Sequence, residues 1–265
     1  MKNKYLFILC PPASGSTLLW KILKTSPHVS AFPGEGKGLV KSILFTEDRW
    51  NPDKVIPWKI VKDIWEKHWD LSQPVLLEKS PPHLTRAKQL ETHFPDSYFI
   101  LMIRNPYAFC EGVKRRWGKN FSYFNIAKFW VICAKYQVDN IKYLKNNIYF
   151  TYEELAGQPE QTCKQIIRFV PELEVLSPAK KFDIFEKSMN ISNLNETQIA
   201  NLTPGDIFEI NEALKKYPDV LTYFNYRYLE PAERVSFKVL RRIHMRIRPG
   251  DCPGPVRWQN WKKLN

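Results

Sequence analysis

Three segments of the sequence place polar or charged side chains directly after a short apolar run. The first run, residues 5–10, leads into Pro-Pro-Ala-Ser-Gly-Ser-Thr. A turn between a buried strand and a helix leaves backbone N–H groups unpaired in the first helical turn, where the helix dipole adds partial positive charge. Ser14, Ser16 and Thr17 add hydroxyl donors. This segment therefore predicts a site for a phosphate or sulfate group.

The loop differs from the phosphate loop of nucleoside triphosphatases, which requires G-x-x-x-x-G-K-[ST]. Here Gly15 is followed by Ser16 in place of lysine, and Cys10 stands where the first glycine is required. Taken alone, the segment is equally compatible with an ordinary corner between a strand and a helix.

Two later segments have the same organisation. Residues 97–116 again read as strand, polar turn and helix. Arg104 follows the apolar run, at the edge where ligands bind in open α/β sheets. Arg116 lies about three helical turns further on. Residues 148–159 end another short apolar run with Tyr152.

Together and in this order, the three segments resemble the sulfotransferases that use 3′-phosphoadenosine 5′-phosphosulfate (PAPS). Pro12-Ala-Ser-Gly-Ser-Thr-Leu-Leu19 resembles the 5′-phosphosulfate loop of that family, and Phe99-Ile-Leu-Met-Ile-Arg-Asn-Pro106 its 3′-phosphate strand. Tyr152-Glu-Glu-Leu155 with Pro159 resembles the segment after a late strand. The resemblance covers roughly residues 5–229. It implies a P-loop-like α/β fold, a three-layer sandwich with a central parallel sheet.

The resemblance also implies a nucleotide site. The donor would be PAPS, the product adenosine 3′,5′-bisphosphate, and no metal is required. The phosphosulfate loop would bind the donor through Ala13, Ser14, Gly15, Ser16 and Thr17. Arg104 would bind the 3′-phosphate together with Gly112 and Arg116 on the following helix. Tyr152 would contact the nucleotide, and it is equally compatible with a core aromatic at a strand end.

Two residues are the candidates for catalysis. Glu35 resembles the catalytic glutamate in the G-E-E segment of protein-tyrosine sulfotransferases, although Gly36 occupies the second acidic position and the spacing is longer. Lys79 resembles the lysine that touches the transferring group, where a mobile ammonium suits a migrating charge. Glu78 is a rival base. The alternatives are a solvent-exposed loop acid for Glu35 and a surface lysine for Lys79.

Two positions depart from the family pattern. Ala13 stands where the family usually has Lys or Arg, and Gly112 stands where serine is usual. Loss of a cation that stabilises the leaving phosphate costs a few kcal/mol in the transition state. Either Lys79 or another basic residue compensates, or the chain binds the nucleotide with weak or no turnover.

The elements that must position these residues alternate along the chain, as in a parallel sheet with helices on both faces. Apolar runs predict strands over 5–10, 75–78, 97–103 and 148–150. Helical spacing predicts helices over 17–24, 58–69, 84–93, 107–116, 123–144 and 159–170, with a further helix after Thr203.

Composition bounds the class of protein. The 265 residues have 44% hydrophobic and 14% aromatic content, which indicates a globular chain. We expect a catalytic domain over 1–229 and a basic C-terminal extension over 230–265. The net charge of +13 favours anionic partners without choosing among them.

Location is suggested by the cysteines and by the lack of long apolar runs. Five scattered cysteines favour thiols in a reducing compartment, and hence the cytoplasm. The sequence has no run of about 20 apolar residues, so no transmembrane segment is expected. The five histidines show no zinc-ligand spacing.

The expected activity is transfer of a sulfonate group from PAPS to a hydroxyl. The Gly-Glu loop and the basic charge favour a tyrosine in an acidic peptide as acceptor, and a carbohydrate or small-molecule hydroxyl remains an alternative. A nucleotide-dependent kinase would need the missing loop lysine and acids for Mg²⁺. A nucleic-acid-binding protein would leave the three segments unexplained, so no nucleic-acid partner is expected. A non-catalytic nucleotide-binding relative is the third alternative.

Overall fold

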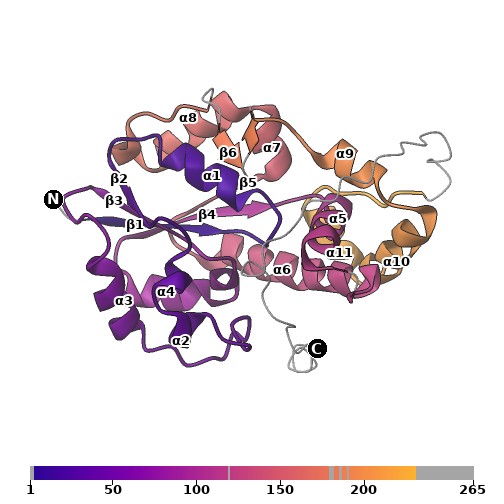
Figure 1. The fold of residues 1–265 in the computed structure, drawn as a ribbon, viewed down its shortest axis with the longest axis horizontal. Helices are drawn as coiled ribbons and strands as arrows, with labels where there is room; N and C mark the ends of the chain where they lie inside the picture. Colours follow the sequence, from indigo (N-terminus) through magenta and orange to yellow (C-terminus); the bar gives the residue numbers. More distant parts are fainter. Residues whose placement is uncertain (1–2, 119, 179–181, 185–186, 190, 231–265) are drawn as a thin grey trace. The chain divides into compact units, whose positions relative to one another are not determined.

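The computed structural model describes residues 3–118, 120–178, 182–184, 187–189 and 191–230 (Figure 1). Its chain forms two compact units. The first comprises the described residues up to Arg104 together with Tyr136–Asn193, and the second comprises Asn105–Lys135 and 194–230. The basic extension expected over 230–265 lies outside the described residues, apart from Glu230 itself.

A five-stranded parallel sheet forms the centre of the first unit, in the order β2-β3-β1-β4-β5. Its strands are β1 (Lys4–Leu9), β2 (Val29–Ala31), β3 (Val75–Lys79), β4 (Ser97–Ile103) and β5 (Asn147–Thr151). The central strand β1 places Phe7 beside Glu78 on one neighbour and beside Phe99 on the other. Five of its six residues are buried, as expected of a strand covered on both faces.

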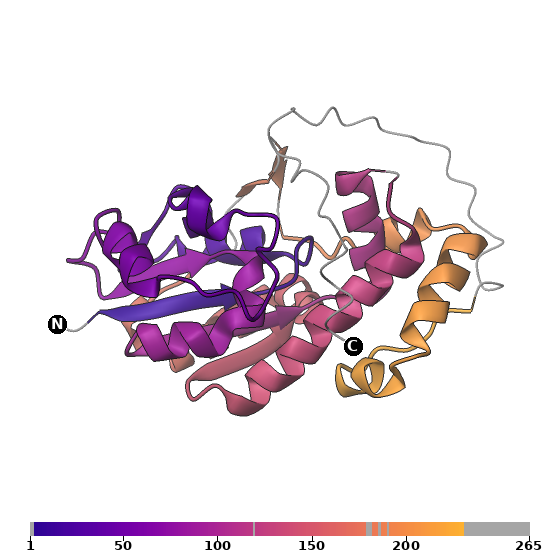
Figure 2. The same ribbon diagram turned by 90° about the horizontal axis from the view of Figure 1, so that it is seen from below.

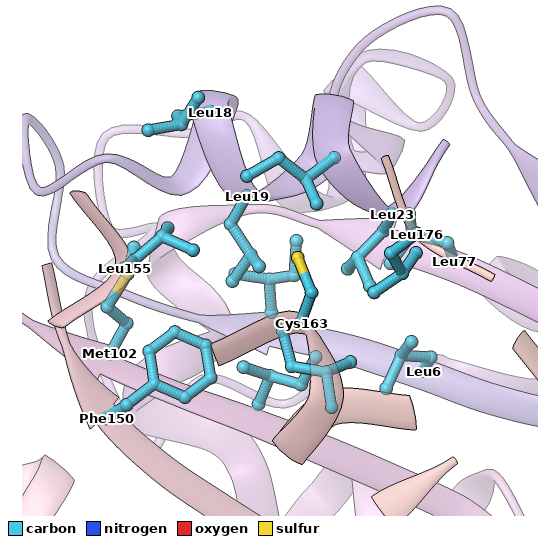
Figure 3. Close-up of a cluster of buried hydrophobic side chains, with 14 of the residues drawn as sticks. Leu6, Leu18, Leu19, Leu23, Leu77, Met102, Phe150, Leu155, Cys163 and Leu176 are labelled. Atoms are coloured by element: carbon cyan, nitrogen blue, oxygen red, sulfur yellow. The ribbon is translucent and has the colours of Figure 1, made fainter. Parts of the chain in front are cut away.

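One face of this sheet is covered by α1 (Ser16–Leu23), α7 (Tyr152–Gly157) and α8 (Pro159–Phe169) (Figure 1). Side chains alternate along a strand, so Leu6 and Ile8 point toward these helices. Figure 3 shows Leu19 of α1 packed above the sheet in the same cluster as Phe150. This cluster anchors the helix that follows the first loop.

The opposite face is covered by α3 (Trp58–Glu66), α4 (Ala87–His93) and the end of α6 (Tyr123–Tyr143) (Figure 2). Its core is rich in aromatic rings, including Trp65, which is fully buried, and Phe7. A parallel sheet between two helical layers confirms the expected fold class.

The second unit is helical. Besides the first part of α6, it contains α5 (Pro106–Trp117), α9 (Asn195–Ala200), α10 (Pro204–Leu214) and α11 (Pro218–Tyr223). The Asn105 side chain caps α5 by accepting the backbone N–H groups of Tyr107 and Ala108. Thr203 and Asp206 form a capping box at the start of α10, at the place that the sequence predicts.

Several short elements differ from the prediction. The segment expected as one helix over 84–93 begins as a 3₁₀ helix, η2 (Pro81–Arg86), before α4. Trp69 lies beyond the end of α3, and β2 was not predicted because three residues are too few to show a strand pattern. The remaining short elements are η1 (Gly36–Gly38), α2 (Lys41–Leu44), η3 (Pro171–Leu173), β6 (Phe182–Ile184) and β7 (Lys187–Met189).

Candidate active site

The loop after β1 turns through two residues with left-handed backbone, Ala13 at φ 57° and Gly15 at φ 90°. Gly15 is the N-cap of α1, so no side chain caps this helix, and its first turn contains no acidic residue. The backbone N–H groups of that turn therefore keep the partial positive charge that favours an anion. Ser16 and Thr17 lie in this first turn, and Ser14 lies just before the N-cap.

Tyr152 packs directly against this loop. A Cβ atom added at Gly15 would lie 2.5 Å from Cδ2 of the Tyr152 ring. The tyrosine is buried in the core beneath α1, and its hydroxyl donates to the carbonyl of Ser192 at 3.2 Å. The sequence suggested that Tyr152 ends a strand, but it is the first residue of α7. Close approach of this ring, as well as the positive φ, requires glycine at position 15.

Arg104 ties the loop to the end of β4. Its Nη1 donates to the carbonyl of Ala13 at 2.9 Å. Its guanidinium carbon lies 4.0 Å from the centre of the Tyr152 ring, a cation–π contact. The side chain is buried at the carboxyl ends of the parallel strands, where ligands bind in open α/β sheets. A guanidinium there suits a phosphate group.

The other two residues expected to bind the nucleotide belong to the second unit. Gly112 and Arg116 lie on α5, where Gly112 is buried and Arg116 is exposed. Their contribution to a nucleotide site stays a prediction.

Glu35 and Lys79 form an ion pair at the same edge of the sheet. Lys79 is the last residue of β3, and its Nζ lies 3.0 Å from Oε1 of Glu35 and 3.5 Å from Oγ1 of Thr17. Lys37, which sequence analysis did not single out, pairs its ammonium with the other carboxylate oxygen of Glu35. The Glu35 carboxylate thus lies beside two ammonium groups, and one of them also reaches the hydroxyl of Thr17 in the first turn of α1.

The charge of Glu35 is set by these neighbours. Burial alone would raise the pKa of this carboxyl, but the ammonium groups of Lys79 and Lys37 outweigh it and hold the pKa below its usual range. Only 26% of the Glu35 side chain is exposed, so it is not the solvent-exposed loop acid of the alternative interpretation. It is a carboxylate at neutral pH, able to accept a proton.

Glu78 points away from this cluster because neighbouring residues of a strand face opposite sides. Its side chain is 1% exposed. Oε1 accepts hydrogen bonds from the Gly36 N–H at 2.9 Å and from the Ser80 hydroxyl at 2.6 Å, and Oε2 lies 3.1 Å from His83 Nε2. The two hydrogen bonds to Oε1 and the near-complete burial argue against Glu78 as the base.

The cations near Glu35 come from several segments, with none at position 13. Besides Lys37 and Lys79, the buried guanidinium of Arg49 interacts with Glu35. Burial lowers the pKa of Arg49, and the charge of Glu35 partly offsets that effect. Arg49 could not be linked to Glu35 by spacing, because two short helical elements, η1 and α2, and irregular turns separate them.

The described residues hold no cluster of three or more His, Cys, Asp or Glu side chains that could bind a metal ion. In the same part of the chain, no helix combines the length and apolar character needed to cross a membrane.

Solved structures with a similar fold are sulfotransferases. The sulfotransferase domain from the curacin biosynthetic pathway is 19% identical, with 86% of this chain and 99% of that domain covered and a TM-score of 0.52. A sulfotransferase from Alicyclobacillus acidocaldarius is 14% identical over 86% of this chain and 98% of its own, with a TM-score of 0.54. Mouse sulfotransferase SULT7A1, solved with PAP, is 12% identical over 86% and 90%, with a TM-score of 0.50. These likenesses show the fold.

Sequence comparison gives a relative and a family. The nodulation protein NoeE of Sinorhizobium fredii (strain NBRC 101917 / NGR234) is 25% identical over 43% of this chain and 32% of its own length. The aligned part therefore spans about a third of that relative. A sequence profile described as the sulfotransferase family matches residues 6–175, from β1 through the loop, β3, β4 and α7. With more than half of its length matched by that profile, this chain belongs to the sulfotransferase family.

Proposed function

We propose that this chain transfers a sulfonate group from PAPS to an acceptor hydroxyl and releases adenosine 3′,5′-bisphosphate. The observation that carries the proposal is the position of Lys79, whose Nζ lies 3.0 Å from the Glu35 carboxylate and 3.5 Å from the Thr17 hydroxyl. This ammonium links a candidate base to the loop of the anion site. Sulfuryl transfer needs the base and the site of the donor anion close together, so that both act on the same reacting atoms.

The residues at this edge fit a nucleotide with two anionic ends. The glycine-lined turn at the start of α1 would hold the 5′-phosphosulfate, with backbone N–H groups and the side chains of Ser14, Ser16 and Thr17 as donors. Arg104 would hold the 3′-phosphate. The bound nucleotide would supply the sulfonate and a phosphate leaving group. On the family resemblance, we extend the nucleotide site to Tyr152.

In this proposal Glu35 accepts the proton of the acceptor hydroxyl as the oxygen attacks. Lys79 is within reach of both Glu35 and the loop, so its ammonium can turn from the carboxylate toward an anion bound at Thr17. Glu35 would then lose one of its neighbouring cations while Lys37 and Arg49 remain, and its pKa would rise, which makes it a stronger base. We assign to Lys79 the stabilisation of the leaving phosphate that Ala13 cannot provide.

The basic surroundings of Glu35 support an acidic acceptor. Lys37 and Arg49 both lie near the carboxylate. They favour a tyrosine in an acidic peptide, as the Gly-Glu loop does, while a carbohydrate or small-molecule hydroxyl remains the alternative acceptor. Buried thiols at Cys10, Cys110 and Cys163 support a cytoplasmic location.

The proposal is tested by transfer of labelled sulfonate from PAPS to a panel of acceptors: an acidic tyrosine peptide, oligosaccharides and simple phenols. Glu35→Gln and Lys79→Met should lower the rate constant of transfer by about 100-fold or more, because each removes a group that acts in the transition state. Both variants should keep their affinity for adenosine 3′,5′-bisphosphate.

Matched controls come from a surface ion pair of the same residue types at the C-terminal end of α10. Glu212 and Lys215, 3.5 Å apart, are both exposed, so Glu212→Gln and Lys215→Met should transfer at the wild-type rate. Full activity of Glu35→Gln and Lys79→Met would show that the assigned residues are wrong. Binding without transfer to any acceptor would favour the non-catalytic relative.

A further inference from the structure

The backbone that follows Glu35 is held by side chains of the protein interior. The N–H of Gly36 donates to Oε1 of Glu78 at 2.9 Å, and its carbonyl accepts from Nε1 of Trp65 at 3.0 Å. The N–H of Lys37 donates to the Ser80 hydroxyl at 3.2 Å. Three consecutive polar groups of the Glu35 loop are thus bound by residues of β3, its end and α3.

Gly36 sits so close to this support that no other residue fits. An added Cβ would lie 2.8 Å from Oε1 of Glu78 and 2.9 Å from Cε2 of Phe32. Both neighbours are buried, so neither can move away without disturbing the core. The close approach of Glu78 and Phe32 therefore explains why glycine follows Glu35.

The supporting carboxylate is itself fixed. Ser80 donates to Glu78 at 2.6 Å, and His83 Nε2 lies 3.1 Å from its second oxygen. The His83 ring packs against the rings of Trp58 and Trp65, with centroids 5.8 and 5.7 Å away. Trp65 thus contacts the Glu35 loop directly and the Glu78 support through His83.

Building on the proposed role of Glu35 as base, we propose that Glu78, with Ser80 and His83, is a positioning residue that sets where the Glu35 carboxylate stands relative to Lys79. Glu78 and Lys79 are neighbours on β3 and face opposite sides. Strand β3 therefore holds the backbone of the Glu35 loop through Glu78 and places the Lys79 ammonium beside the Glu35 carboxylate. Misplacement of a reacting group by about 1 Å can cost about 100-fold in rate.

The first experiment measures amide hydrogen exchange in the ligand-free protein. Glu78→Ala and Ser80→Ala should speed exchange of the Gly36 and Lys37 amides by about tenfold or more, while the amides of α1 keep their protection. The control is Asp206→Ala, which removes a different carboxylate that accepts a backbone N–H, that of Thr203 at 2.8 Å. Unchanged exchange at Gly36 and Lys37 in both test variants would overturn the proposal.

The second experiment compares transfer with nucleotide binding. In Glu78→Ala and Ser80→Ala, kcat for sulfonate transfer from PAPS should fall by about 10- to 100-fold, with the Kd for adenosine 3′,5′-bisphosphate unchanged. The acidic limb of the pH–rate profile should move, because the carboxylate of Glu35 no longer stands beside Lys79. Glu78→Gln, which keeps an oxygen acceptor for Gly36, should recover part of the rate.

The outcomes separate the two proposals. Wild-type kcat in both Glu78→Ala and Ser80→Ala, or an equal loss of rate and nucleotide affinity, would assign Glu78 to stability alone and overturn the positioning role. If Glu78→Ala does not fold, Ser80→Ala carries the same test. If the wild-type protein transfers sulfonate to no acceptor, the proposed function fails, and the exchange experiment still decides whether Glu78 and Ser80 hold the loop.

Discussion

Glu35 is held between the ammonium groups of Lys37 and Lys79, and its charge contributes to stability as well as to chemistry. Because these cations hold its pKa below the usual value, their stabilisation is fully present above the unfolded-state pKa of about 4.3. It is lost as the pH falls through the lower pKa of the folded protein.

We therefore expect Glu35→Gln to unfold at lower denaturant concentration than the wild type at pH 7. The cost should be about 1.5 kcal/mol, the lower end of the range for hydrogen bonds to charged groups, because the Glu35 side chain is partly exposed. Unfolding curves at pH 7 and at successively lower pH measure the difference, which should shrink below pH 4. A difference that is constant over this range would contradict the ion-pair account.

Single residues show what the sequence could and could not reveal. Short motifs singled out Glu35, Lys79 and Arg104, and the structure brings the first two together as an ion pair. Because side chains alternate along a strand, the sequence could have predicted that Glu78 and Lys79 face opposite sides. It could not have predicted that Glu78 binds Gly36, which lies 42 residues away. The pairing of Lys79 with Glu35 joins residues 44 positions apart in sequence, and a local sequence pattern does not encode such a long-range contact.

At the scale of elements, the turn from β1 into α1 is the most demanding connection of the site. Gly15→Ala would force a Cβ to within 2.5 Å of the Tyr152 ring at a φ of 90°. We expect a loss of about 1–3 kcal/mol in the free energy of unfolding, together with weaker binding of adenosine 3′,5′-bisphosphate.

The matched control is Gly157→Ala at the end of α7, where an added Cβ meets no atom within 4 Å. Denaturant unfolding of the two variants beside the wild type makes the comparison. Equal stability of Gly15→Ala and Gly157→Ala would show that the turn tolerates a side chain and that the close packing of Tyr152 is not required.

Most elements follow from sequence patterns, and the exceptions have local causes. The strand over 97–103 and the helix α8 were predicted almost to the residue because long apolar periods and flanking prolines mark them. Helix α7 was missed, although Thr151 and Glu154 form a capping box, the S/T-x-x-E signal of a helix start. The helix expected from residue 84 begins instead as the 3₁₀ helix η2, whose first two residues are Pro81 and Pro82.

At the scale of the molecule, the parallel sheet explains how residues far apart in sequence meet. The loop after β1, Lys79, Arg104 and Tyr152 each lie at the end of a different strand or just after it, and the carboxyl ends of parallel strands share one edge. Alternating strands and helices predicted that common edge. The strand order, with β1 between β3 and β4, could not be predicted, since it depends on long-range pairing.

Calorimetric titration with adenosine 3′,5′-bisphosphate tests most directly whether this edge of the sheet binds the nucleotide of a sulfotransferase. We expect micromolar affinity that depends on the 3′-phosphate, so AMP should bind about tenfold or more weakly. Arg104→Ala should lose most of the affinity, whereas Arg168→Ala, at an exposed arginine of α8, should keep it. No binding would contradict the assignment of this edge as the nucleotide site of a sulfotransferase. A preference for ATP with Mg²⁺ would contradict it too and would favour a nucleotide-dependent kinase.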